Sequence, residues 1–403
     1  MATLANVQIA DKGSPFDSGG GYLLAQKCEL DEIVPLTPDR EVEVHKNSPY
    51  VVARIKGATD AMNAFNESHE AVQQALDLLS AQGKAHLSTR NVLDERLVWW
   101  REMSGQILRI ISVAEMALRI GPVKLVHKDK DGNVIPDIPP PIIHHESLRY
   151  FRLSQITDNL FDAFRNMYLA FESLLERIAP RGRGEREGDW FKRALNTANS
   201  SIPLSRGFTP TTSDVIADIH DQIYRDIRCA IFHSKSGLRL LPQNLVERDK
   251  VSDGLRKVTR LVLLLAEHYL HSRYISGGLF MSAFNRMMES LLQTSTILVS
   301  DTDLPYDRLD TLDSPALKSA VEMKTVLAPE LSEPGLIFVF GTIKAADLCQ
   351  LMRVSRFDIK RDNKLEMTAT IEAELKYEGI DILEAQMGLQ LRNIREPKHL
   401  YAA

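Results

Sequence analysis

The chain has 403 residues, of which 44% are hydrophobic and 26% are charged, a composition that excludes collagen-like, disordered and disulfide-stapled proteins. A chain of this length exceeds the usual size of a single core, so we expect two or three domains. The formal net charge of -5 argues against a large nonspecific DNA or RNA surface, which needs many Lys and Arg side chains, but leaves room for a small catalytic groove.

The three cysteines, Cys28, Cys229 and Cys349, are too far apart for a CxxC metal site, and their odd number does not suit a disulfide framework. Such usage is typical of a reducing compartment. The N-terminus lacks a basic segment followed by a long apolar run, and the most apolar stretch, residues 261–265, is too short to cross a bilayer. We therefore predict a cytoplasmic protein without a membrane association.

Residues 1–143 are predicted to form a mixed α/β domain. Two short alternating runs within 41–56 are typical of a strand pair, and apolar residues at helical spacing predict a helix over 58–82. Aromatic and branched residues over 96–115 favour strands again.

Two features of this first domain resemble binding motifs, but we interpret one as a turn and the other as core packing. The run from Gly19 to Gly21 lacks the GK[ST] ending of a phosphate-binding loop, so we interpret it as a flexible turn. Trp99 and Trp100 could stack on bases, but one of two neighbouring strand residues normally faces a core. We expect at least one of them to be buried.

The proline-rich segment 136–141, PDIPPP, marks a domain boundary, because proline removes backbone donors and bars helix. An all-α domain is predicted over 144–299, since wide apolar stripes recur there at helical spacing. The predicted helices cover 147–180, a short run from 189, a third after Pro210, 246–274 and 279–292.

Residues 300–315 are rich in Asp and Pro and are predicted to be a linker. The last segment, 316–403, shows alternation typical of a sheet with one solvated face, so a small β-rich domain is predicted there. The expected fold class is therefore α+β multidomain, with a central all-α domain between a mixed N-terminal domain and a β-rich C-terminal domain.

The third predicted helix ends in YRDIRCAIFHSKSG, in which Arg228 is followed by four residues and then His233. This is the R-x4-H signature of HEPN domains, and the preceding segment RYFRLSQITDNLFDAFRNMYLAFESLLERI resembles the first long helical region of that family. The resemblance covers about residues 147–275 and makes the central domain HEPN-like. Because the bare pattern is common by chance, its helical context carries the resemblance. The general layout is similar to ApeA-like HEPN proteins of bacterial defence.

The resemblance implies metal-independent RNA cleavage without a cofactor, in which the 2′-hydroxyl attacks its own phosphate. His233 would be the acid/base group, since imidazole titrates near neutrality, and Arg228 would clamp the phosphate. Asp221 and Tyr224 are the candidate acidic or polar helpers, which we expect on the same face, and Lys235 could add a phosphate contact.

On an ideal helix Arg228 and His233 lie about 140° apart, and Arg228 is expected to point away from the isoleucine stripe of its helix. The two residues can then serve one site only if the helix ends near His233 or a second subunit closes the groove. HEPN sites commonly form between two such helices, so we expect a homodimer.

The functional hypothesis is a HEPN-type endoribonuclease, an RNA-cleaving hydrolase that acts in antiviral or abortive-infection defence, with flanking domains that sense a trigger or bind a protein partner. The alternative is a catalytically inactive HEPN-like scaffold that dimerises and binds a protein partner. Cys229 favours this alternative, because active HEPN nucleases often carry Asn, Asp or His after the Arg, and a thiol is a weak donor. The acidic net charge of the chain favours it as well. A toxin paired with a nucleotidyltransferase is weaker still, since it would need Tyr in place of Lys235.

Overall fold

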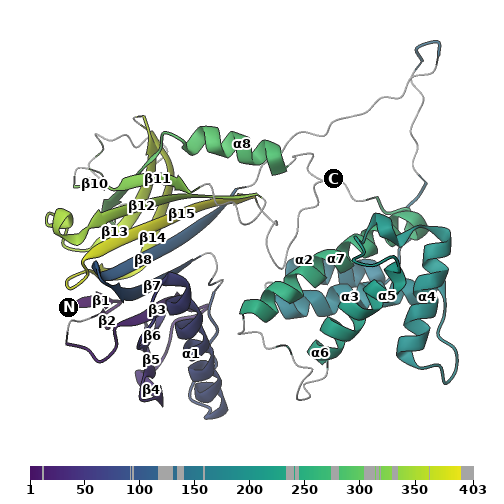
Figure 1. The fold of residues 1–403 in the computed structure, drawn as a ribbon, viewed down its shortest axis with the longest axis horizontal. Helices are drawn as coiled ribbons and strands as arrows, with labels where there is room; N and C mark the ends of the chain where they lie inside the picture. The colour runs from purple at the N-terminus through teal and green to yellow at the C-terminus, as the bar shows by residue number, and fades with distance from the viewer. Residues whose placement is uncertain are drawn as a thin grey trace. The chain divides into compact units, whose positions relative to one another are not determined.

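The computed structural model divides into two compact units (Figure 1). It describes residues 1–10, 13–90, 92, 95–116, 130–133, 140–157, 159–232, 240, 245–273, 281–303, 314, 317, 319–328, 335–362 and 364–391. The first unit combines the described residues within Met1–Ala117 with those within Met281–Leu391, and the second holds those within Leu118–Phe280. The first unit is therefore built from two distant parts of the chain.

A nine-stranded sheet is the larger element of the first unit. Its strands, in spatial order, are β11 (Lys324–Ala328), β12 (Leu336–Lys344), β15 (Ile382–Leu391), β8 (Gly105–Met116), β7 (Glu95–Glu102), β3 (Ser18–Leu23), β6 (Tyr50–Ile55), β5 (Arg40–Val44) and β4 (Glu32–Thr37). Strand β15 lies between β12 and β8, and it pairs with β8 in parallel while its pairing with β12 is antiparallel. The last described strand of the chain thus joins the first third to the final third.

The second sheet of this unit has six strands and mixes the same two parts of the chain. Its strands, in spatial order, are β10 (Val321–Glu322), β9 (Thr296–Ser300), β13 (Val354–Arg361), β14 (Lys364–Lys376), β1 (Ala2–Leu4) and β2 (Val7–Ala10). The N-terminal strand β1 is antiparallel to β14, with Thr3 opposite Lys376. A helix, α8 (Met281–Leu292), packs against β12.

The first unit has three layers, as the alternating directions of neighbouring residues along β3 show. A Cβ at Gly20 would lie 2.5 Å from Ser68 Oγ of helix α1 (Ala61–Ala81), whereas a Cβ at Gly21 would lie 2.7 Å from the Leu4 side chain of β1. Because neighbouring strand residues face opposite sides, α1 covers one face of the nine-stranded sheet and the six-stranded sheet covers the other. Figure 1 shows α1 lying along strands β3 to β7.

The expectation of a flexible turn at Gly19 to Gly21 was wrong, since these residues form the buried middle of β3. A Cβ at Gly19 would lie 2.2 Å from the Ala53 carbonyl oxygen and 2.3 Å from the Trp99 ring. Glycine is needed here because neighbouring groups occupy the space of a side chain. Trp99 and Trp100 are both buried, which confirms the expectation that at least one faces a core.

The second unit consists of helices around one apolar core. They are α2 (Ser147–Ile156), α3 (Leu160–Ile178), α4 (Glu187–Ser201), the 3-10 turn η1 (Leu204–Arg206), α5 (Val215–Ile219), the π-helix η2 (His220–Arg228), α6 (Cys229–Phe232) and α7 (Leu245–Leu270). The Asn159 side chain accepts hydrogen bonds from the backbone of Phe161 and Asp162, so it begins α3 and splits the single run predicted over 147–180. None of the helices in the described part of the chain is long and apolar enough to cross a membrane.

The predicted fold class was wrong. Of the described residues, 39% are helical and 31% lie in strands, and they are organised by two large sheets of six and nine strands rather than by a central all-α bundle between two separate flanking domains. The strands expected to form a small C-terminal domain pair instead with strands from the first third. The limits of the units, at 117/118 and 280/281, also lie away from the boundaries expected at residues 143 and 299. Local periodicity predicts that a segment is a strand, but it does not show which distant strand will pair with it, as β8 and β15 do here.

Gly19→Ala should destabilise the first unit by about 1–3 kcal/mol, because the added methyl meets a backbone carbonyl and an indole ring that cannot both move away. Trp99 and Trp100 belong to this unit, so tryptophan fluorescence in a Trp190→Phe background follows its unfolding by urea. Gly182→Ala, in an exposed loop of the second unit, is the matched control and should leave the unfolding midpoint unchanged. Equal midpoints for Gly19→Ala and the control would contradict the packing described.

Candidate functional site

The residues singled out from the sequence fall in and around the π-helix η2. Asp221, Tyr224 and Arg228 lie on η2 itself, and Cys229 begins α6 and is partly buried. His233 and Lys235 lie outside the described residues. The structure therefore brings Tyr224 and Arg228 together, and the expected approach of His233 to Arg228 stays a prediction.

Two adjacent rows of side chains determine how this helix is oriented. Ile219, Ile223 and Ile227 are buried in the core of the second unit. The residue that follows each of these isoleucines is His220, Tyr224 or Arg228, and these three form a second row beside the first. In η2 the Cys229 amide donates to the Tyr224 carbonyl, five residues back, which is the wide register of a π-helix and a frequent feature of functional sites.

The expectation that Arg228 points away from the isoleucine stripe was wrong. Its side chain is only 13% exposed and forms an ion pair with Glu187 of α4. Its guanidinium carbon lies 5.7 Å from the centre of the Tyr168 ring, 5.3 Å from that of Tyr224 and 5.1 Å from that of Phe232. Cation–π attraction to the three rings and the ion pair with the carboxylate hold the guanidinium in place.

Two carboxylates and a buried phenol complete the surroundings of Arg228. Burial raises the pKa of Glu172 on α3, and the negative charge of Glu187 raises it further. Burial also raises the pKa of Tyr168 well above its ordinary value, with Glu172 adding to the effect, so the phenol is neutral at physiological pH. The Tyr168 hydroxyl is buried and has no hydrogen-bond partner among the described residues, a state that costs about 1–3 kcal/mol.

His220 is a member of this site that sequence reasoning missed. Its Nδ1 lies 3.0 Å from Asp221 Oδ1, and its ring stacks on Tyr224 with centroids 5.2 Å apart and an interplanar angle of 24°. This hydrogen bond is the main reason that the pKa of Asp221 is lowered. The signal in the sequence was the spacing of four residues from His220 to Tyr224 and again to Arg228, with an acid beside the first.

The first turn of α4 lies against the same row of side chains. A Cβ at Gly188 would lie 3.8 Å from both His220 Nε2 and the Tyr224 hydroxyl, so these two atoms face one small region of backbone. Glu187 is in this first turn, where a negative charge is favourable at a helix N-terminus. The site thus combines an imidazole, two phenols, a fixed cation and carboxylates, groups that suit proton transfer beside an anion.

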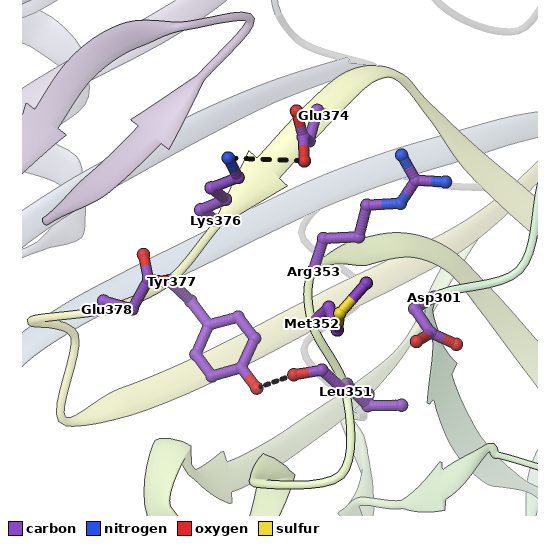
Figure 2. Close-up of a pocket in the computed structure, with 8 residues that line it drawn as sticks. All are labelled: Asp301, Leu351, Met352, Arg353, Glu374, Lys376, Tyr377 and Glu378. Carbon is purple, nitrogen blue, oxygen red and sulfur yellow. Dashed lines mark hydrogen bonds and ion pairs between the residues drawn. The ribbon is translucent and has the colours of Figure 1, made fainter.

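A hollow lies in the first unit, where the ends of β9 and β14 meet the loop before β13 (Figure 2). Its volume is about 540 Å³, and it is lined by Asp301, Leu351, Met352, Arg353, Glu374, Lys376, Tyr377 and Glu378. Lys376 pairs with Glu374 at 3.6 Å and Arg353 pairs with Asp303. Burial raises the pKa of Tyr377, whose hydroxyl donates to the carbonyls of Leu348 and Leu351. The described lining of the hollow contains no residue of the R-x4-H motif, and its lysine, arginine and tyrosine each have a partner, so we place the candidate site at η2.

No family model, curated protein or solved structure matches this chain.

Glu172→Gln should stabilise the second unit at pH 7.5 by a few degrees in melting temperature. The folded-state pKa of Glu172 is raised above its ordinary value of 4.5, so the ionised carboxyl opposes folding once the pH exceeds that value. The advantage of Gln should shrink as the pH falls towards 4, where the carboxyl is protonated in both states. Thermal unfolding at pH 7.5 and pH 4 measures the difference, with Glu176→Gln on the exposed face of α3 as the control. An advantage of the same size at both values would contradict the raised pKa.

Proposed function

We propose that this chain is a metal-independent endoribonuclease of the HEPN type, with Arg228 and His233 as its R-x4-H motif. The observation that supports this most is the fixed position of Arg228, whose guanidinium is held by Glu187 and three aromatic rings. A preorganised guanidinium loses little side-chain entropy when it binds a phosphate, and it stabilises the charge that develops in the transition state. Phe232, one of these three rings, is itself 40% exposed, so one ring of the enclosure borders solvent.

In the proposed reaction the ribose 2′-oxygen attacks the adjacent phosphorus and the bond from phosphorus to the 5′-oxygen breaks. One base takes the proton of the 2′-hydroxyl, and one acid returns a proton to the leaving 5′-oxygen. His233 takes part as an acid/base group, and Arg228 contacts the nonbridging oxygens. The products are a 2′,3′-cyclic phosphate and a 5′-hydroxyl end.

The proposal includes a homodimer, in which a second copy closes the groove between Arg228 and His233. It also places the protein in the cytoplasm as an effector of antiviral or abortive-infection defence, with the first unit receiving the trigger or a protein partner. These parts rest on the resemblance of the motif and its helical context to HEPN proteins.

One observation favours a second candidate, a catalytically inactive HEPN-like scaffold that dimerises and binds a protein partner. Arg228 already has a carboxylate partner in Glu187, its side chain is only 13% exposed, and Cys229 follows it in place of a stronger hydrogen-bond donor. In that role the ion pair would tie α4 to η2 and stabilise the helical unit.

Cleavage of a mixed-sequence RNA oligonucleotide by the wild type, Arg228→Ala and His233→Ala separates the two candidates. The ribonuclease predicts that wild-type activity persists in EDTA and that each substitution lowers kcat by at least about 100-fold. Arg165→Ala, an exposed arginine on α3, is the control and should cleave at the wild-type rate. Equal rates for all four proteins, or no cleavage by the wild type, would contradict the proposal.

A further inference from the structure

We infer that His220, oriented by Asp221, is a second proton-transfer residue of the proposed ribonuclease and takes the proton of the attacking 2′-hydroxyl. This inference rests on the proposed function and deepens it. A cleavage of this kind needs two proton transfers, one from the 2′-oxygen and one to the 5′-oxygen. Two separate groups can perform them without a change of protonation state between the steps.

The geometry of His220 is that of an oriented base. Its Nδ1 is engaged by Asp221 Oδ1 at 3.0 Å, which selects the tautomer with the proton on Nδ1 and leaves Nε2 as an acceptor. No hydrogen bond reaches Nε2 from any residue that the structure describes. The side chain is 15% exposed, so it is positioned by its neighbours and remains open to solvent. A base that is held by a third group is the arrangement from which nucleophile activation is recognised.

The ring is fixed from two sides. It stacks on Tyr224, and its centroid lies 6.4 Å from that of Phe191 on α4. Arg225 also pairs with Asp221, at 3.1 Å, so the carboxylate that orients His220 is itself held. These contacts keep the imidazole in one orientation relative to the backbone of η2.

Tyr224 connects the imidazole to the cation. The same phenol ring lies between His220, stacked at 5.2 Å, and Arg228, whose guanidinium carbon is 5.3 Å from the ring centre. A dinucleotide segment with its phosphate near Arg228 can therefore place a ribose alongside Tyr224, towards His220. The buried Tyr168 hydroxyl, which has no partner in the described structure, gives an independent sign that a polar ligand completes this enclosure.

The proton balance of the step is complete with named groups. His220 Nε2 accepts the proton from the 2′-hydroxyl as the bond from the 2′-oxygen to phosphorus forms. The acid of the proposed R-x4-H motif donates a proton to the 5′-oxygen as its bond to phosphorus breaks. The leaving group separates the two roles in an experiment. If the leaving group departs without a proton, loss of the acid no longer slows cleavage, whereas loss of the base still does.

The test uses the full-length chain and two RNA oligonucleotides, one natural and one with a bridging 5′-sulfur at the bond that the wild type cuts. His220→Asn should lower kcat by at least about 100-fold on both substrates with little change in KM, whereas His233→Asn should recover on the 5′-thio substrate. Asp221→Asn should be slowed on both substrates to a smaller extent. Asp226→Asn, on the same helix, is the matched control and should behave as the wild type.

Cleavage at the wild-type rate by His220→Asn, beside a loss of cleavage in Arg228→Ala, would overturn the inference and leave the proposed function standing. Recovery of His220→Asn on the 5′-thio substrate would also overturn it, since His220 would then be an acid. No cleavage by the wild type would refute both. If His220→Asn is poorly folded, His220→Ala is assayed with added imidazole. Recovery of cleavage supports the loss of a base at this position, and a low rate that imidazole does not raise in a folded variant contradicts the inference.

Discussion

The parallel pairing of β8 with β15 is the constraint on which the rest of the structure depends. It runs from Ile107 opposite Ile382 to Met116 opposite Leu391, in a sheet whose other strand pairs are antiparallel among the described residues. A parallel pair cannot be closed by a short hairpin and requires a long connection. Here the connection includes the described helices of the second unit, so that unit is an insertion into a β structure whose two parts lie on either side of it in the sequence.

Inside the helical unit a single row of side chains determines what the candidate site contains. Burial of Ile219, Ile223 and Ile227 fixes the rotation of η2, and the following residues His220, Tyr224 and Arg228 are thereby turned towards α3 and α4. The apolar core and the polar site are two consequences of the same helical register. This is why Arg228 is enclosed by rings instead of lying on a solvated face.

Local features were predictable from the sequence because they depend on nearby residues. The helix over 58–82 and the strands over 96–115 are confirmed by α1, β7 and β8. The buried role of Gly19 to Gly21 was missed, since it is created by Trp99 and Ala53 on neighbouring strands. At the site, the motif identified Arg228, but the geometry of an ideal helix predicted wrongly that its side chain points away from the isoleucine stripe. His220 was missed because its significance lies in its stacking on Tyr224 and its bond to Asp221.

The insertion is tested most directly by a double-mutant cycle on Arg109 of β8 and Glu384 of β15, whose side chains form an ion pair at 2.7 Å between Nε and Oε2. Arg109→Ala, Glu384→Ala and the double variant are compared with the parent by urea unfolding, followed by Trp99 and Trp100 fluorescence in a Trp190→Phe background. The structure predicts a coupling energy of about 1–3 kcal/mol. Effects that simply add, to within about 0.5 kcal/mol, would show that the two strands are not neighbours and would contradict the account.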